Sequence, residues 1–295
     1  MSSGKFDTVQ IAGLRAVTQP DPVQVIAVSG GKGGVGKTSV AVNLATALAR
    51  AGKRVLVFDG DLGLANVDVL LGLAPKYTLE HVLDGRCTLE EAAIETPQGF
   101  RILPSASGVT RLASLSSPEH LGIVQAFSQL TTSLDVLIVD TAAGIADSVR
   151  QFCQAAQHVL VVLRDEPASL TDAYALVKVL RRDHGVRRFQ VLANMSRAAG
   201  EGESLFRKLE RVTSRFLDVV LEYAGEIPDD PLVRKSIREQ RSVLQAYPSS
   251  PAARAFERLA RQTQRWPGVD GPRGNLEFFV ERLLPREIPR LEAVR

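Results

Sequence analysis

The sequence predicts an α/β fold in which helices flank a mainly parallel β-sheet. Short apolar runs alternate with helical patterns along the chain, and each run ends in a polar residue or a turn. Nearly continuous apolar strands are typical of a sheet whose two faces are both covered by helices. The chain has 295 residues, of which 45% are hydrophobic and 23% charged, which is the composition of an ordinary soluble globular protein.

Six apolar runs are expected to form the strands of this sheet. They occupy residues 23–29, 54–59, 100–105, 134–140, 158–164 and 189–194. The first run leads into a glycine-rich loop. Residues 39–52 then follow a helical pattern that ends at Gly52, since glycine commonly stops a helix.

Residues 22–265 are expected to form a single domain, because no proline- or glycine-rich linker divides them. A leader precedes this domain at residues 1–21, and a tail follows it at residues 266–295. The first part of the tail, residues 266–274, is too rich in proline and glycine to continue a helix.

The tail then carries an apolar stripe that predicts an amphipathic helix at about residues 275–284. The stripe consists of Leu276, Phe279, Val280 and Leu283. This spacing places the four side chains on one face of a helix. Such a face either meets a membrane surface or packs in a groove of the domain itself, and the stripe alone leaves both alternatives open.

Composition and charge exclude several classes of function. The formal net charge is only +3, so no direct contact with nucleic acid is expected. Cys87 and Cys153 lie far apart without the spacing of a zinc site, which favours a reducing compartment. The first residues lack the apolar core of a signal peptide, and no apolar run approaches the roughly 20 residues that span a bilayer. A cytoplasmic protein is therefore predicted.

Residues 29–38, which read SGGKGGVGKT, form a phosphate-binding loop between a strand and a helix. They contain the pattern G-x-x-x-x-G-K-[S/T]. Its glycines let backbone N–H groups turn toward phosphate oxygens. Lys37 is expected to reach the β- and γ-phosphates of a nucleotide, and the Thr38 hydroxyl is expected to ligate Mg²⁺. The expected ATP contacts in this loop are Gly31, Lys32, Gly33, Gly34, Val35, Gly36, Lys37, Thr38 and Ser39.

The early lysine of this loop resembles a motif of the MinD/ParA class of P-loop ATPases. Residues 32–38, KGGVGKT, are similar to the deviant Walker A motif of that class. The resemblance implies that Lys32 reaches across a dimer interface and contacts the phosphates held by the partner subunit. A cation supplied in this way makes the complete site depend on dimerisation. The alternative is that Lys32 is a solvated surface charge.

Three aspartates fit the same class at the ends of apolar strands, where ligands bind in open α/β sheets. By resemblance, Asp59 holds a magnesium-bound water, and Asp61 orients the water that attacks ATP. Asp140 is similar to the Walker B carboxylate that contacts the Mg²⁺ shell. Lys32, Lys37 and Asp61 are therefore the predicted catalytic residues. For Asp61, the alternative is the N-cap of a helix.

Four further residues resemble the contacts that the class makes with base and ribose. Asn194 ends a strand, and its amide can both donate to and accept from adenine. Pro228 and Asp230 match the I-P-x-D segment that lines the base, and Glu166 corresponds to a residue near the partner's ribose. Turns and helix caps are the alternative roles for these residues.

Within the class, the chain resembles the FleN/FlhG regulators of flagellar number. The resemblance rests on residues 61–73, 138–145, 165–178 and 275–283. It implies a weak Mg²⁺-dependent ATPase that forms a homodimer with ATP. It further implies that the dimer restrains a FleQ-like transcription activator and acts with an FlhF-like GTPase at the cell pole. A ParA-type DNA-partitioning ATPase and a MinD-type division-site ATPase are the alternatives.

Two details qualify this resemblance. In the leader, Gln10, Leu14 and Arg15 match an element by which FlhG proteins stimulate the FlhF GTPase, whereas Val9 replaces an acidic residue. An unstructured leader is the alternative. Gly60 stands between the two aspartates where alanine is common in the family, which removes no functional group.

Overall fold

The computed structural model describes residues 23–105, 117–128, 130, 134–267 and 278–279. The leader at residues 1–21, with its predicted FlhF-activating element, lies outside this part of the chain. Most of the predicted amphipathic helix lies outside it as well, apart from Phe278 and Phe279.

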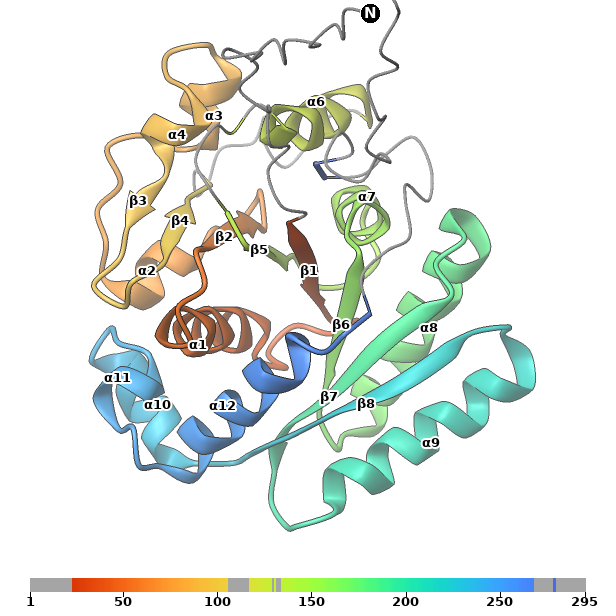
Figure 1. Cartoon of the computed structure of the whole chain (residues 1–295). Helices are drawn as coiled ribbons and strands as arrows, with labels where there is room; N and C mark the ends of the chain where they lie inside the picture. Colours follow the sequence, from red (N-terminus) through yellow and green to blue (C-terminus); the bar gives the residue numbers. More distant parts are fainter. Residues whose placement is uncertain (1–22, 106–116, 129, 131–133, 268–277, 280–295) are drawn as a thin grey trace, which may run out of the picture.

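Eight strands form one sheet in the order β3-β4-β2-β5-β1-β6-β7-β8 (Figure 1). All neighbouring strands are parallel except the antiparallel pair β3 and β4, so the predicted fold class is confirmed. The strands are β1 (Gln24–Ser29), β2 (Val55–Gly60), β3 (Ile94–Glu95), β4 (Arg101–Leu103), β5 (Val136–Thr141), β6 (His158–Leu163), β7 (Arg188–Ser196) and β8 (Val220–Pro228). All six predicted strands are present, whereas β3 and β8 were not predicted.

Helices cover both faces of the sheet. They are α1 (Lys37–Arg50), α2 (Val67–Leu71), α3 (Leu79–Leu83), α4 (Leu89–Ala92), α6 (Ser117–Ser128), α7 (Asp147–Ala155), α8 (Pro167–His184), α9 (Glu201–Phe216), α10 (Pro231–Arg238), α11 (Val243–Ala246) and α12 (Pro251–Thr263). Side chains of α6, α7, α8 and α9 join one apolar core, and those of α1, α11 and α12 join the other. Alternate residues of each central strand face opposite cores. In β1, Val25 and Ala27 join the first core, whereas Ile26 and Val28 join the second.

Two phenylalanines of the tail pack against the domain itself. Phe278 and Phe279 are fully buried, and the Phe278 N–H donates to the Ala155 carbonyl at the end of α7 at 3.2 Å. Their rings lie 5.2 and 6.3 Å from the ring of Phe127 on α6. The φ angle of Phe279 is 56°, in the left-handed region, so this residue does not follow a right-handed α-helical path.

No helix in the described part of the chain combines the length and the apolar character needed to cross a membrane.

Candidate nucleotide-binding site

The glycine-rich loop connects the carboxyl end of β1 to the first residue of α1, as predicted. Gly36 is the N-cap of α1, and its φ angle of 91° is one that side chains rarely allow. A Cβ at Gly36 would lie 2.4 Å from Asn194 Nδ2, and a Cβ at Gly31 would lie 2.2 Å from backbone atoms of Asp172. Glycine is thus required at both positions by close approach of neighbouring groups, which keeps the loop compact.

Lys37 begins α1 and is only 9% exposed. Burial lowers the pKa of its ammonium group, because a low-dielectric surrounding disfavours the charged form. The negative charges of Asp140 and Asp61 act in the opposite direction on this pKa. The structure therefore brings Lys37 and two of the three predicted aspartates to one place at the end of the sheet.

Asp59 and Asp140 occupy adjacent positions in the register of β2 and β5. Asp59 accepts hydrogen bonds from the N–H groups of Asn66, Val67 and Asp61, at 2.8, 3.0 and 3.2 Å. Burial and the charge of Asp140 nevertheless raise the pKa of Asp59 to about 8. Burial likewise raises the pKa of Asp140 to about 7, although a hydrogen bond with Thr38 and the charge of Lys37 lower it.

These residues form a set of oxygen donors that fits Mg²⁺. Asp140 Oδ1 is buried and has no hydrogen-bond partner among the described residues, while the Asp140 carboxyl also bonds with the Thr38 side chain. An unpaired buried carboxylate oxygen is costly unless a cation or a water satisfies it. Hard divalent cations prefer carboxylate and hydroxyl oxygens of this kind. Thr38, Asp59 and Asp140 are therefore suited to the predicted magnesium site.

Asp61 lies in the turn that leaves β2. Its Oδ1 accepts a hydrogen bond from the Leu64 N–H at 3.1 Å. The N-cap position of the following helix, α2, belongs to Asn66, so Asp61 does not take the alternative role of helix cap. Its part-exposed side chain remains close enough to act electrostatically on Lys37 and Asp140.

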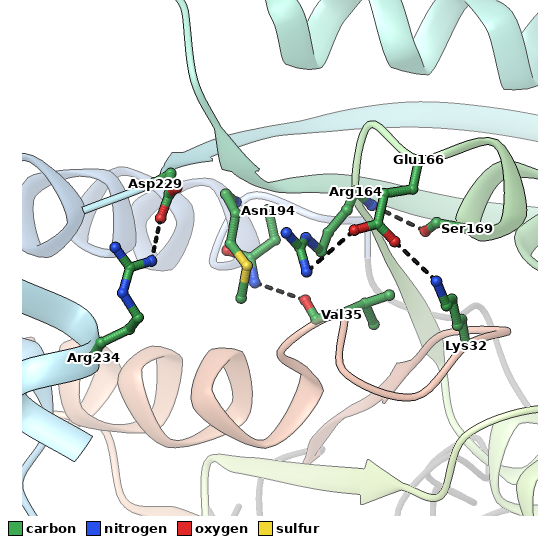
Figure 2. Close-up of polar contacts among 9 residues, drawn as sticks. Lys32, Val35, Arg164, Glu166, Ser169, Asn194, Asp229 and Arg234 are labelled. Carbon is green, nitrogen blue, oxygen red and sulfur yellow. Dashed lines mark hydrogen bonds and ion pairs between the residues drawn. The ribbon is translucent and has the colours of Figure 1, made fainter. Parts of the chain in front are cut away.

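Lys32 forms an ion pair with Glu166, although 134 residues separate them (Figure 2). The Lys32 ammonium donates to Glu166 Oε2 at 2.9 Å, and Arg164 Nη1 lies 3.4 Å from Glu166 Oε1. Two residues predicted to act at a dimer interface are thus brought together within one chain. The hydrogen bond from Lys32 and the charges of Arg164 and Lys32 lower the pKa of Glu166.

Asn194 contacts the phosphate loop and is 6% exposed. Its Nδ2 donates to the Val35 carbonyl at 2.8 Å (Figure 2). Its Oδ1 accepts from the Met195 N–H at 3.0 Å. The amide is therefore already paired on both sides. Contact with adenine stays a prediction, and it would use the second N–H of Nδ2 or the second lone pair of Oδ1.

Asp230 has a capping role in this structure. One oxygen accepts from the Leu232 N–H of α10 at 2.9 Å, and the other accepts from the Ala252 N–H of α12 at 3.2 Å. A single buried carboxylate thus satisfies orphan amides at the starts of two helices. This is the capping alternative stated above, and its backbone can still lie near a base.

Pro228 lines a pocket of about 470 Å³ beside the ends of β7 and β8. The same pocket is bordered by Ser196, Arg197 and Pro251, and by Arg254 on α12. Pro228 also pairs with Ser196 in the sheet, two residues beyond Asn194. The pocket therefore lies at the carboxyl ends of β7 and β8, the edge where open α/β sheets bind ligands.

Comparison with known proteins agrees with this geometry. The family model described as ParA, NUBPL iron-transfer P-loop NTPase, matches residues 22–264. The chain belongs to the ParA family of P-loop NTPases. Antiactivator FleN of Pseudomonas aeruginosa is 59% identical to it over 263 residues, which cover 89% of this chain and 94% of that protein. The flagellum site-determining protein YlxH of Helicobacter pylori is 31% identical, covering 88% and 89%. The predicted resemblance to flagellar regulators is confirmed.

Solved structures of ParA-family ATPases have the same fold. The cell division ATPase MinD of Pyrococcus furiosus superposes with a TM-score of 0.71 and 26% identity, covering 83% of this chain and 100% of that one. MinD of Pyrococcus horikoshii complexed with Mg-ADP has a TM-score of 0.68 and 27% identity, covering 83% and 97%. As a ParA-family member, the chain is an ATPase that uses ATP and Mg²⁺, as predicted.

Sequence reasoning missed two features of this ParA-family site. Arg164 was not predicted, and its only signal is its place two residues before Glu166 at the end of an apolar run. The Asn66 and Val67 amides that bind Asp59 were also missed, because backbone donors leave no trace in residue type.

Proposed function

We propose that this chain is an ATP-dependent dimeric switch that regulates flagellar number by restraining a transcription activator. The observation that carries the proposal is the 59% identity to a protein named antiactivator FleN, over 94% of that protein's length. A second relative is named a flagellum site-determining protein. The site described above supplies the nucleotide chemistry that such a switch needs.

In each subunit, the phosphate loop and Lys37 bind the phosphates of ATP. Backbone N–H groups of residues 31–38 and the N-terminus of α1 favour negative charge there. Thr38 and Asp140 hold Mg²⁺, and Asp59 holds one of its waters. When bound, Mg²⁺ neutralises charge on the phosphate oxygens. Asp61 orients the attacking water in this proposal, and its position in the turn after β2, where it accepts from the Leu64 N–H, supports that role.

Dimerisation completes the site in this proposal. Lys32 contributes its ammonium to the phosphates bound by the partner subunit, and Glu166 approaches the partner's ribose. The base lies near Asn194 and in the pocket lined by Pro228. ATP hydrolysis then removes the contacts that hold two subunits together, so the nucleotide sets the lifetime of the dimer.

The proposal also includes interactions with other proteins and with the membrane. The ATP-bound homodimer restrains a FleQ-like activator. The leader at residues 1–21 contacts an FlhF-like GTPase. The tail at residues 266–295 includes the amphipathic segment, which gives at most a peripheral membrane contact. The protein acts in the cytoplasm or at the cell pole, without direct contact to nucleic acid.

A deletion strain of the native bacterium tests this function. Flagella per cell are counted by electron microscopy, and cell length and division are scored in the same cells. The deletion is expected to raise flagellar number, and the wild-type gene is expected to restore it, whereas a Lys37→Ala gene is not. Normal flagella combined with misplaced division septa would instead indicate a MinD-type role, and loss of plasmid or chromosome partitioning would indicate a ParA-type role.

A further inference from the structure

Glu166 lies between two cations. Its Oε2 accepts from the Lys32 ammonium at 2.9 Å, and its Oε1 faces Arg164 Nη1 at 3.4 Å (Figure 2). Each carboxylate oxygen thus has its own positive partner. This arrangement joins the phosphate loop to the segment that precedes α8. It engages Lys32, the lysine that the family resemblance expects to contact phosphates held by the partner subunit.

The ion pair holds the Lys32 side chain against a residue of its own chain. A lysine that donates to Glu166 cannot at the same time reach phosphates in a second subunit. The two side chains are 40% and 33% exposed, and ion pairs of this kind shift an equilibrium by only about two- to fivefold. The contact is therefore weak enough to exchange and strong enough to measure.

Arg164 is placed to keep Glu166 neutralised after such an exchange. Its N–H donates to Ser169 Oγ at 3.0 Å, and its carbonyl accepts from the Glu166 N–H at 2.8 Å. These bonds fix Arg164 and Glu166 in one turn just before α8. Without a neighbouring cation, an ionised Glu166 would be repelled by the phosphates of a nucleotide as two subunits close.

We propose that Glu166 holds Lys32 in cis until two nucleotide-loaded subunits meet, and that Arg164 becomes the sole counter-ion of Glu166 when Lys32 crosses to the partner. The inference rests on the proposed function, because it takes the trans contact of Lys32 from there. It adds a competing contact within the monomer and assigns Arg164 as a positioning residue.

The first test measures the reactivity of the Lys32 amine. Purified full-length protein without nucleotide is labelled briefly with acetic anhydride, and acetylation of Lys32 is quantified by mass spectrometry. Glu166→Gln removes the charge but keeps a hydrogen-bond acceptor, so labelling of Lys32 is expected to rise about two- to fivefold. Labelling of Lys53, which lies between α1 and β2 and is remote from Glu166 in sequence, serves as the internal reference. Equal labelling of Lys32 in both proteins overturns the cis contact.

The second test measures dimerisation by analytical ultracentrifugation with a non-hydrolysable ATP analogue. Arg164→Gln is expected to weaken dimerisation by about two- to fivefold while the analogue binds the monomer with unchanged affinity. Arg164→Lys restores the charge and is expected to recover most of the dimer. Arg181→Gln removes a similarly exposed arginine of α8, whose partner is Asp218, and serves as the matched control. Normal dimerisation of Arg164→Gln overturns the role of Arg164.

A third variant separates this inference from the proposed function. If Lys32→Ala dimerises normally with the analogue, the trans contact itself is wrong, whatever Glu166 and Arg164 do. If Lys32→Ala fails to dimerise but Glu166→Gln and Arg164→Gln behave as wild type, the proposed function stands and the exchange does not. Melting temperatures close to that of the wild type show that each variant is folded.

Discussion

Asp59 and Asp140 are paired residues on the neighbouring parallel strands β2 and β5, and both are buried at the end of the sheet. Two carboxylates held side by side in this way repel each other when both are ionised. Burial is the larger cause that raises the pKa of Asp59 to about 8 and that of Asp140 to about 7. The pair is thus a source of instability that a divalent cation relieves.

This relationship predicts a pH dependence of stability in metal-free protein. An unfolded aspartate releases its proton near pH 4, whereas the folded pair keeps its protons to pH 7 or 8. The folded state therefore binds more protons across this window, and the free energy of unfolding falls as pH rises, by about 1 kcal/mol per pH unit for each group. Urea denaturation in EDTA between pH 5 and 8 measures this fall. Asp59→Asn is expected to reduce the slope, and an unchanged slope would contradict the assignment.

The two lysines of the loop are expected to give different defects. Lys37→Ala removes a buried cation from the proposed phosphate site, so ATP affinity is expected to fall about 10- to 100-fold. Lys32→Ala leaves the loop and the magnesium carboxylates intact, so each monomer is expected to bind ATP but not to dimerise. A binding titration with fluorescent ATP, beside sedimentation of the same samples, separates the two defects. Equal loss of ATP affinity in both variants would argue against a trans role for Lys32.

Asp61→Ala is expected to separate nucleotide binding from hydrolysis. The Asp61 carboxylate accepts from the Leu64 N–H on a surface turn, so its loss removes little packing. Positioning of the attacking water is needed in hydrolysis alone, and phosphate release is expected to fall roughly 100-fold or more. ATP binding and ATP-dependent dimerisation are expected to persist. Turnover at the wild-type rate shows that Asp61 does not orient the water.

Glycines 33 and 36 form a matched pair within one loop. A Cβ at Gly36 would meet Asn194 Nδ2 at 2.4 Å and would require an L-residue at a φ angle of 91°. Gly36→Ala is therefore expected to lower the free energy of unfolding by about 1–2 kcal/mol. A Cβ at Gly33 would have nothing within 4 Å, so Gly33→Ala is expected to keep wild-type stability or gain up to about 1 kcal/mol. Thermal denaturation of both variants checks this difference, and similar melting temperatures would contradict it.

Much of the fold could be predicted because its central strands are buried on both faces and read as continuous apolar runs. The edge strand β8 could not, since its sequence VLEYAGEIP interleaves charged and small residues and is only partly buried. Strand β3 has only two residues, too few for any pattern.

Local motifs likewise predicted where the phosphate loop and Asp140 lie. They could not predict contacts between residues that are far apart in the sequence and that only the folded chain brings together. The contact between Lys32 and Glu166 spans 134 residues. Asp230 caps a second helix only because the fold brings the Ala252 N–H against it.

The buried phenylalanines of the tail yield the last prediction. Phe279 is fully buried against Phe127, within a core that also contains Phe58, the residue before Asp59. Phe279→Ala is therefore expected to lower the free energy of unfolding by about 3–5 kcal/mol, because it leaves a cavity in a close-packed aromatic cluster. Phe216→Ala is the control, since Phe216 is 60% exposed and its loss is expected to cost under about 1 kcal/mol. Guanidinium denaturation measures both values, and liposome flotation of the same proteins measures membrane contact. Wild-type stability of Phe279→Ala combined with weaker flotation would mean that Phe279 serves the membrane instead of the core.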